Sequence, residues 1–117
     1  MANPPVHIDS VNFGEIVING KIFDSDMTLF WNGKMSYRSK EHLVEMGEFM
    51  KILMSKPEIV VIGIGMQGAV KIAPEVAEWA ENVKVKIYTE VTPKAAEMFN
   101  AFVSEGRRTA GIFHVTC

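Results

Sequence analysis

The sequence has little of what marks a secreted, membrane or nucleic-acid-binding protein. Its 117 residues contain one cysteine, Cys117, so an internal disulfide cannot form and nothing indicates an oxidising compartment. The longest apolar run, Ile59 to Met66, has eight residues, whereas a membrane helix needs about 20. Twelve Lys and Arg against 14 Asp and Glu give a net charge of −2. Nucleic-acid-binding domains carry an excess of basic residues, so this balance argues against that function.

Targeting and metal-binding patterns are also missing. The first twenty residues contain no Lys or Arg, whereas a secretory signal needs a basic start and a mitochondrial transit peptide needs several arginines. The three histidines lack metal-ligand spacing. No complete catalytic motif is present. We therefore expect a cytoplasmic protein without a metal or cofactor.

The composition is that of an ordinary globular domain. Hydrophobic residues make up 48% and charged residues 22% of the chain, and the length suits one domain. Pro4 and Pro5 keep the start of the chain out of a helix. We expect an extended lead-in over residues 1–10 and a single α/β domain over residues 11–117.

The first third of the domain has the pattern of antiparallel strands. Asn19-Gly20 lies between apolar runs and is a strong hairpin signal, because both residues accept a positive φ. It predicts strands over residues 11–18 and 21–30. A second turn at Asn32-Gly33 leads to a short strand over residues 34–38.

The rest of the chain alternates helices with strands. Residues 58–63 are apolar at nearly every position, which predicts a central strand covered on both faces and flanked by strands 84–89 and 109–115. Helical stripes precede Lys56-Pro57 and follow Pro74, and Trp79 is expected to be buried in the second of these helices. Such alternation favours parallel pairing through right-handed crossovers, so we expect a sheet with helices packed on it and an N-terminal antiparallel addition.

The third helix has clear boundary signals. Thr92-Pro93 predicts its start, with Thr92 as the capping residue, and Gly106 predicts its end. Phe99 lies on its apolar stripe and is expected in the core.

A glycine loop follows the central strand. Gly63, Gly65 and Gly68 match the G-x-G-x-x-G pattern, and Glu90 lies 22 residues beyond Gly68, as in dinucleotide-binding proteins. That motif works when a helix begins inside the glycine turn and points its amides at phosphate. Here the next helix begins only at Pro74, so we predict no NAD or NADP binding. The other interpretation is a loop that lets the backbone pass close to a neighbouring strand.

The C-terminal residues are polar. His114 and Cys117 suggest a base and a thiol nucleophile. Residues three apart on a strand point to opposite faces, so the alternative is a histidine at a strand end and a free thiol.

Arg38 and His42 could hold a carboxylate or phosphate at a pocket rim, and Lys71 could add positive charge there. The plain alternative is a surface arginine and a histidine near a helix start. Ligands bind at the carboxyl ends of parallel strands. We therefore predict a small pocket between the glycine loop and the C-terminal residues His114, Thr116 and Cys117. Arg38, as a surface residue, and His42 are expected to supply positive charge there for an anionic group.

The chain also resembles a known family. The resemblance rests on Gly63-Ile64-Gly65 after the apolar strand, on Pro74-Glu75, and above all on the ending His114-Val115-Thr116-Cys117. The sequence is similar to a small domain of unknown function, found in the mitochondrial respiratory complex I assembly factor three, in the cytosolic adipogenesis-associated domain protein and in many prokaryotic proteins. The resemblance extends from about Phe13 to Cys117.

The resemblance implies a three-layer α/β domain with a mixed central sheet, a small appended sheet and no established catalytic residues. The family's recurrent polar positions correspond here to the glycine loop (Gly63, Gly65 and Gly68) and to Arg38, His42, Lys71, Asn100, His114 and Thr116. The family's usual Trp-x-Trp-Arg is replaced by Ser36-Tyr37-Arg38. The N-terminus does not resemble a mitochondrial targeting segment, which argues for a prokaryotic-type member rather than a complex I role.

These observations predict a protein of unknown function that acts as a non-catalytic binding or assembly-type module. Its expected partner is a protein or a small anionic ligand, and its expected state is a monomer or a weak homo-oligomer. We expect no contact with nucleic acid or membrane. The alternatives are a small-molecule or anion-binding enzyme that uses the Gly63–Gly68 loop, and a redox protein that uses Cys117.

Overall fold

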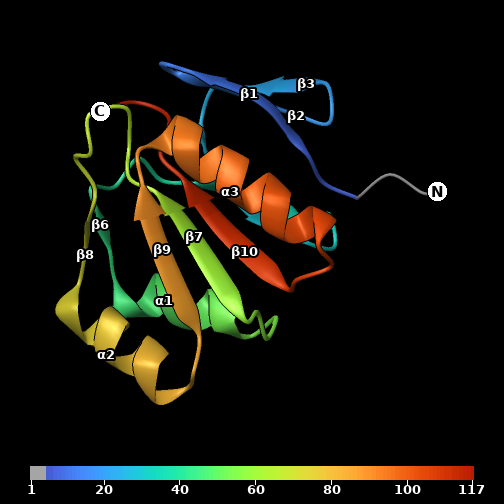
Figure 1. Ribbon diagram of the computed structural model, residues 1–117. Coiled ribbons are helices and arrows are strands. Elements are labelled where there is room, and N and C mark those ends of the chain that lie inside the picture. Colours follow the sequence, from blue (N-terminus) through green and yellow to red (C-terminus); the bar gives the residue numbers. More distant parts are fainter. Residues whose placement is uncertain (1–4) are drawn as a thin grey trace.

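The computed structural model describes residues 5–117 as a layered α/β structure (Figure 1). The elements in chain order are β1 (Ile8–Asn12), β2 (Glu15–Ile18), β3 (Lys21–Phe23), β4 (Asp26–Phe30), β5 (Met35–Arg38), β6 (Leu43–Val44), α1 (Met46–Leu53), β7 (Ile59–Gly63), β8 (Lys71–Ile72), α2 (Pro74–Asn82), β9 (Lys86–Glu90), α3 (Thr92–Ser104) and β10 (Thr109–Phe113).

Five strands form a mixed central sheet in the order β5-β4-β10-β7-β9. Strands β10, β7 and β9 run parallel to one another, while β4 is antiparallel to β10 and β5 is antiparallel to β4. All five residues of β7 are buried, and β7 lies between β10 and β9. The predicted fold class and the predicted place of strand 58–63 are therefore confirmed.

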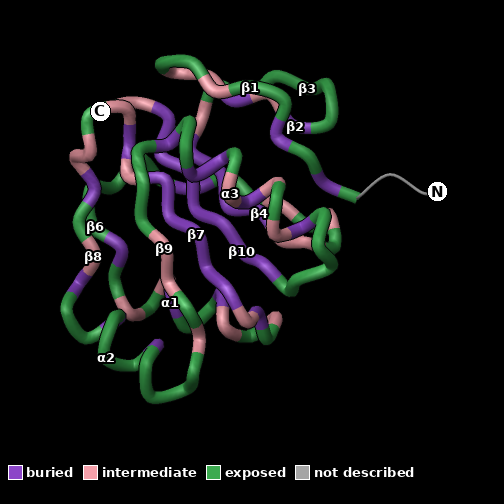
Figure 2. The backbone as a smooth tube through the Cα atoms, viewed as in Figure 1, coloured by how far each residue is buried: buried purple, intermediate pink, exposed green. Residues whose placement is uncertain are grey.

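The two faces of this sheet carry separate halves of the core, because successive strand residues point to opposite faces. On one face, α3 and the β1-β2-β3 sheet cover Val61 and Phe113. The centroids of the Phe99 and Phe113 rings are 5.5 Å apart on this face. On the other face, α1 and α2 cover Val60 and Ile62. Figure 2 shows β7 and β10 as the buried centre of the molecule. Within residues 5–117, no helix is long and apolar enough to cross a bilayer.

The antiparallel part differs from the prediction at two turns. The expected strand 11–18 is interrupted at Phe13-Gly14, where Gly14 has a φ of +81°, so β1 and β2 form a hairpin of their own. The expected strand 21–30 breaks at Asp24-Ser25, so β3 stays with the small sheet and β4 enters the central one. Strand β1 also takes residues 8–10 of the expected lead-in, while residues 1–4 lie outside the described part of the chain.

The helices agree closely with the predicted boundaries, including the starts at Pro74 and Thr92 and the end before Gly106, whose φ is +78°. The prediction for Trp79 is wrong, since this side chain is 36% exposed. Helix α2 buries only Val76 and Ala80 among its nine residues. The two-residue parallel pair of β6 with β8 had no signal in the sequence.

Candidate functional site

A buried carboxylate organises the polar residues at one end of the central sheet. Asp26 is the first residue of β4 and is 1% exposed. Its Oδ2 lies 2.9 Å from Arg38 Nη1 and 2.7 Å from His114 Nδ1, and its Oδ1 accepts the N–H of Val115 at 3.1 Å. Because a carboxylate accepts hydrogen bonds, His114 presents its Nδ1–H to Asp26. The cluster joins the start of β4, the end of β5 and the segment after β10.

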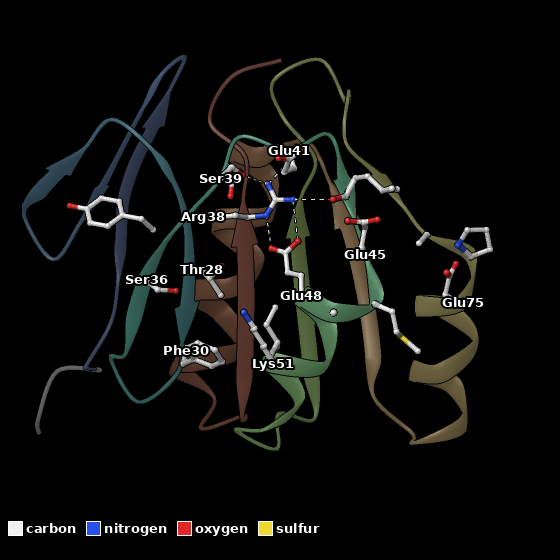
Figure 3. A pocket seen from close by; sticks show the side chains of 17 residues that line it. Thr28, Phe30, Ser36, Arg38, Ser39, Glu41, Glu45, Glu48, Lys51 and Glu75 are labelled. Carbon is white, nitrogen blue, oxygen red and sulfur yellow. Dashed lines mark hydrogen bonds and ion pairs between the residues drawn. The ribbon is translucent and has the colours of Figure 1, made fainter.

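Arg38 is enclosed rather than placed on a surface rim, so that prediction is wrong. Its side chain is 5% exposed, and its guanidinium also reaches Glu48, with Nε 2.6 Å from Oε2 and Nη2 3.3 Å from Oε1. The remaining N–H groups point at backbone carbonyls of Ser39, Glu41 and Leu43. The register explains this, because Asp26 and Arg38 are direct partners across β4 and β5. Figure 3 shows the guanidinium between the carboxylate of Glu48 and the segment that holds Ser39 and Glu41.

His114 contacts the same carboxylate oxygen of Asp26 as Arg38 does, and it forms a chain of further contacts. The His42 ring packs edge-on against the His114 ring, with 5.0 Å between the ring centroids. Thr116 Oγ1 lies 3.2 Å from His114 Nε2. Arg38 and His114 are therefore joined through a shared carboxylate. Carboxylate, imidazole and hydroxyl also follow the order of a nucleophile triad. However, the His114 side chain has no exposed surface and does not line either of the cavities described below.

The glycine loop holds the C-terminal segment with its own amides. Met66 N–H donates to Thr116 O at 2.7 Å, and the N–H groups of Gln67 and Ala69 donate to Cys117 O at 2.7 and 3.2 Å. These donors are the ones that a phosphate would need, and they are already used. No helix follows the loop directly, since β8 separates it from α2. The loop therefore lacks the structure of a dinucleotide site.

Gly65 shows why glycine is required in this loop. Its φ is +105°, and a Cβ there would collide with the backbone of Cys117 and come within 2.9 Å of His114 Cδ2. Gly63, at the end of β7, packs closely against Thr92, while Gly68 has a φ of +72° and open surroundings. The backbone at Gly65 does make a close approach, as in the second interpretation of the motif, but its neighbour is the segment after β10 rather than a strand.

Thr92 connects the glycine loop to the C-terminal segment, and the sequence did not suggest this role. It is not the helix cap, because Val91 occupies that position and α3 has no side-chain cap. The fully buried Thr92 Oγ1 donates to His114 O at 2.6 Å and accepts the N–H of Gly65 at 2.9 Å. A Thr-Pro pair at a helix start is a capping signal, and only the tertiary structure gives this hydroxyl its other partners.

Two of the predicted site residues have other roles. Asn100 binds the backbone of Ile8 through both ends of its amide, at 2.9 and 2.8 Å, and so joins α3 to β1. Lys71 is an exposed residue of β8 whose backbone N–H donates to His42 O. Cys117 is an exposed free thiol. Within residues 5–117, no three His, Cys, Asp or Glu side chains are grouped as a metal would require.

A large cavity lies beside α1, and its lining includes no residue of the Gly63–Gly68 loop. It is a groove of about 1000 Å³ between the outer part of the sheet face, formed by β4 and β5, and helix α1, with the start of α2 at its far side (Figure 3). Its apolar lining includes Phe30, Leu43, Met46 and Ile52. Its charged lining consists of Arg38, Glu41, Glu45, Glu48, Lys51 and Glu75.

The groove is acidic. The positive charge of Arg38 is more than balanced by the two carboxylates that hold it, Asp26 and Glu48. This leaves three exposed glutamates, Glu41, Glu45 and Glu75, against a single lysine, Lys51. The expected rim of positive charge is absent from this groove, which favours a cationic group over an anionic one.

Comparisons with known proteins agree with this fold. Residues 8–114 match the model of a family described as protein of unknown function (DUF498/DUF598). A conserved hypothetical protein, PH1505, from Pyrococcus horikoshii OT3 is 27% identical, with a TM-score of 0.84 over 94% of this chain and 98% of that one. A structure titled MT938 is also 27% identical, with a TM-score of 0.81 over 96% and 99%. A Bordetella pertussis protein described as an Mth938-like domain shares the fold at 15% identity and a TM-score of 0.74, over 97% and 87%.

Proposed function

We propose that this chain, which belongs to the DUF498/DUF598 family of proteins of unknown function, is a non-catalytic, assembly-type module that binds a basic segment of a partner protein in the groove beside α1. The observation that carries this proposal is an open groove whose lining combines apolar residues with exposed glutamates. A segment that alternates basic with apolar side chains would satisfy both parts at once.

The groove has the features of a peptide-binding surface. On this face of the sheet, Thr28, Phe30 and Ser36 of β4 and β5 line the groove instead of lying beneath a helix. Its volume is in the range of about 300–1,000 Å³ that is typical of ligand sites. The bonds from Arg38 to Glu48 fix one wall, so little ordering cost remains for the wall when a segment binds.

The alternative enzymatic functions have less support. An anion- or nucleotide-binding enzyme needs free amides in the Gly63–Gly68 loop, and the C-terminal segment occupies Met66, Gln67 and Ala69. Catalysis by His114 needs access to its Nε2, and this side chain is fully buried. A protein partner therefore fits the structure better than a small anionic ligand or a chemical reaction.

We also propose the finer identity that the resemblance implies. The 27% identity to a protein from Pyrococcus horikoshii OT3 supports a prokaryotic-type member of the family. An assembly role means that the module holds another protein without changing it chemically. We place it in the cytoplasm, away from nucleic acid and membrane, on the single cysteine and the balanced charge.

Peptide binding tests this proposal. The probe is a fluorescently labelled peptide of alternating lysine and leucine, and a glutamate–leucine peptide of equal length is the control probe. Binding is followed by anisotropy for the parent protein and for Glu45→Gln and Glu75→Gln. Each lost charge pair at an exposed site is worth about 0.2–1 kcal/mol, which weakens binding by about 1.5- to 5-fold.

The matched control is Glu97→Gln, an exposed glutamate on α3 outside the groove, which should leave the dissociation constant unchanged. Equal binding of the two peptides, or equal effects of Glu45→Gln and Glu97→Gln, would overturn the groove assignment. A micromolar dissociation constant for NAD or NADP by calorimetry would instead restore the nucleotide interpretation.

A further inference from the structure

The outer edge of β9 presents backbone groups that the central sheet does not use. Strand β9 ends the order of the sheet, beside β7 alone (Figure 1). Lys86 N–H donates to Glu58 O at 3.1 Å, and Glu90 O accepts the N–H of Ile64 at 2.9 Å. Because backbone groups alternate sides along a strand, Lys86, Tyr88 and Glu90 turn theirs toward β7. Ile87 and Thr89 therefore turn their N–H and C=O groups outward.

The sequence of β9 is self-complementary around Tyr88. When two copies of Lys86–Glu90 lie antiparallel with Tyr88 at the centre, Lys86 faces Glu90 of the other copy on both sides. Ile87 then faces Thr89 of the other copy. These two residues have outward backbone groups, so they form the hydrogen-bonded pair of an antiparallel ladder. Both charged side chains are exposed, and neither is in an ion pair within residues 5–117.

The two faces of the edge support the same pairing. Tyr88 packs against Phe102 on the α3 face, with 5.3 Å between the ring centroids, and it is half-buried. Because the pairing is centred on Tyr88, the two copies of this ring would meet at the twofold axis. Ile87 and Thr89 line a second cavity of about 570 Å³ on the α2 face. This cavity has a mainly apolar wall formed by Ile72, Ala77, Ala80 and Val85. An added strand would extend that wall and reduce its exposure to water.

We propose that a second copy of this chain pairs with the edge of β9, which joins the two five-stranded sheets into one continuous sheet. The interface is isologous, as a twofold dimer requires, because the same strand serves both copies. The groove beside α1 lies over β4 and β5 at the opposite end of the strand order, so the dimer leaves it open. A five-residue edge is much smaller than a standard interface of about 1,600 Å², so the dimer is weak and concentration-dependent.

Charge reversal tests this pairing by sedimentation velocity over a series of protein concentrations. The parent protein should shift from monomer to dimer as its concentration rises. Lys86→Glu places two carboxylates opposite each other, and Glu90→Lys places two ammonium groups opposite each other, so each variant alone should remain a monomer at concentrations where the parent is a dimer. An equimolar mixture of the two variants should recover the dimer, because each contact then joins opposite charges.

Lys34→Glu serves as the control, since this exposed lysine lies in the β4–β5 turn at the other edge of the sheet. It should dimerise like the parent. Unchanged circular dichroism shows that the variants fold. A parent protein that stays monomeric at every concentration overturns the proposal, and so does a dimer that survives both single reversals or a mixture that fails to dimerise.

Discussion

The Asp26 cluster predicts a large loss of stability for a change of very few atoms. Asp26→Asn keeps the size of the side chain but removes its charge, in a position that is 1% exposed. The carboxylate accepts three hydrogen bonds, from Arg38, His114 and Val115. An asparagine has one acceptor oxygen, and its NH₂ group would face a donor on the other side.

The expected cost follows from what remains paired. Breaking a buried ion pair by removing one partner costs about 3–5 kcal/mol. Arg38 keeps its bidentate contact with Glu48, so its charge is not left alone, and we expect a loss of about 3 kcal/mol in the free energy of unfolding. Glu48→Gln should cost less than Asp26→Asn, because the Glu48 side chain is 27% exposed and water can replace part of the interaction.

Urea denaturation followed by circular dichroism measures both losses. Asp24→Asn, two residues earlier and exposed, is the control and should change stability by less than about 0.5 kcal/mol. A loss below about 1 kcal/mol for Asp26→Asn would refute the reasoning, since about 1 kcal/mol is the average loss for any point substitution.

Substitutions at three further positions test other parts of the structure. Phe99→Ala should cost about 3–5 kcal/mol in denaturation, because the ring is fully buried against Phe113, and a loss below about 1 kcal/mol would contradict this packing. Thr92→Val leaves the N–H of Gly65 and the carbonyl of His114 unpaired in the interior, at a cost of about 1–3 kcal/mol each in the free energy of unfolding. Thr92→Ser keeps the hydroxyl, so this variant should lose less stability. Equal losses for the two variants would exclude the hydrogen-bonding role of Thr92. The Arg108 backbone N–H, and then the Arg107 side chain, lower the pKa of Glu58 in the folded protein. The charged form of Glu58 therefore stabilises the fold at pH values above the pKa that this residue has in the unfolded chain. This contribution disappears as the pH falls through the lowered pKa. The stability difference between the parent and Glu58→Gln should therefore be present at pH 7 and vanish in acid, and a difference independent of pH would contradict the linkage.

Much of the fold could be predicted because its signals are local. An all-apolar run identifies β7 as a covered strand, and proline or glycine marks where α2 and α3 begin or end. The break at Asp24-Ser25 could not be predicted, because β3 and β4 read as one strand until each has its own partner. The prediction that Trp79 is buried was wrong for a related reason. A helical stripe shows the inner face of a helix, but it does not show how far the core extends beneath that face.

Only part of the polar cluster around Asp26 could be predicted from the sequence. Arg38 and His114 could be nominated as chemically capable residues, but the carboxylate that joins them is separated from His114 by 88 positions. No local pattern distinguishes Asp26 from the exposed Asp24 two residues earlier. Thr92 was assigned the more common task of its sequence context. A residue that acts through long-range partners gives no periodic signal, so its role appears only once the sheet order is known.

The same cluster decides which carboxylates of the groove are free to bind. Glu48 lines the groove, but both of its oxygens already contact Arg38, so an incoming cation would have to compete with a buried guanidinium. Glu45 and Glu75 line the same groove, are exposed, and form no ion pair within residues 5–117. Removing Glu48 should therefore affect mainly stability, whereas removing Glu45 or Glu75 should affect mainly binding. Measuring both quantities on all three glutamine variants separates the two roles, and a Glu48→Gln variant that lost binding while keeping full stability would place the contact at Glu48 instead.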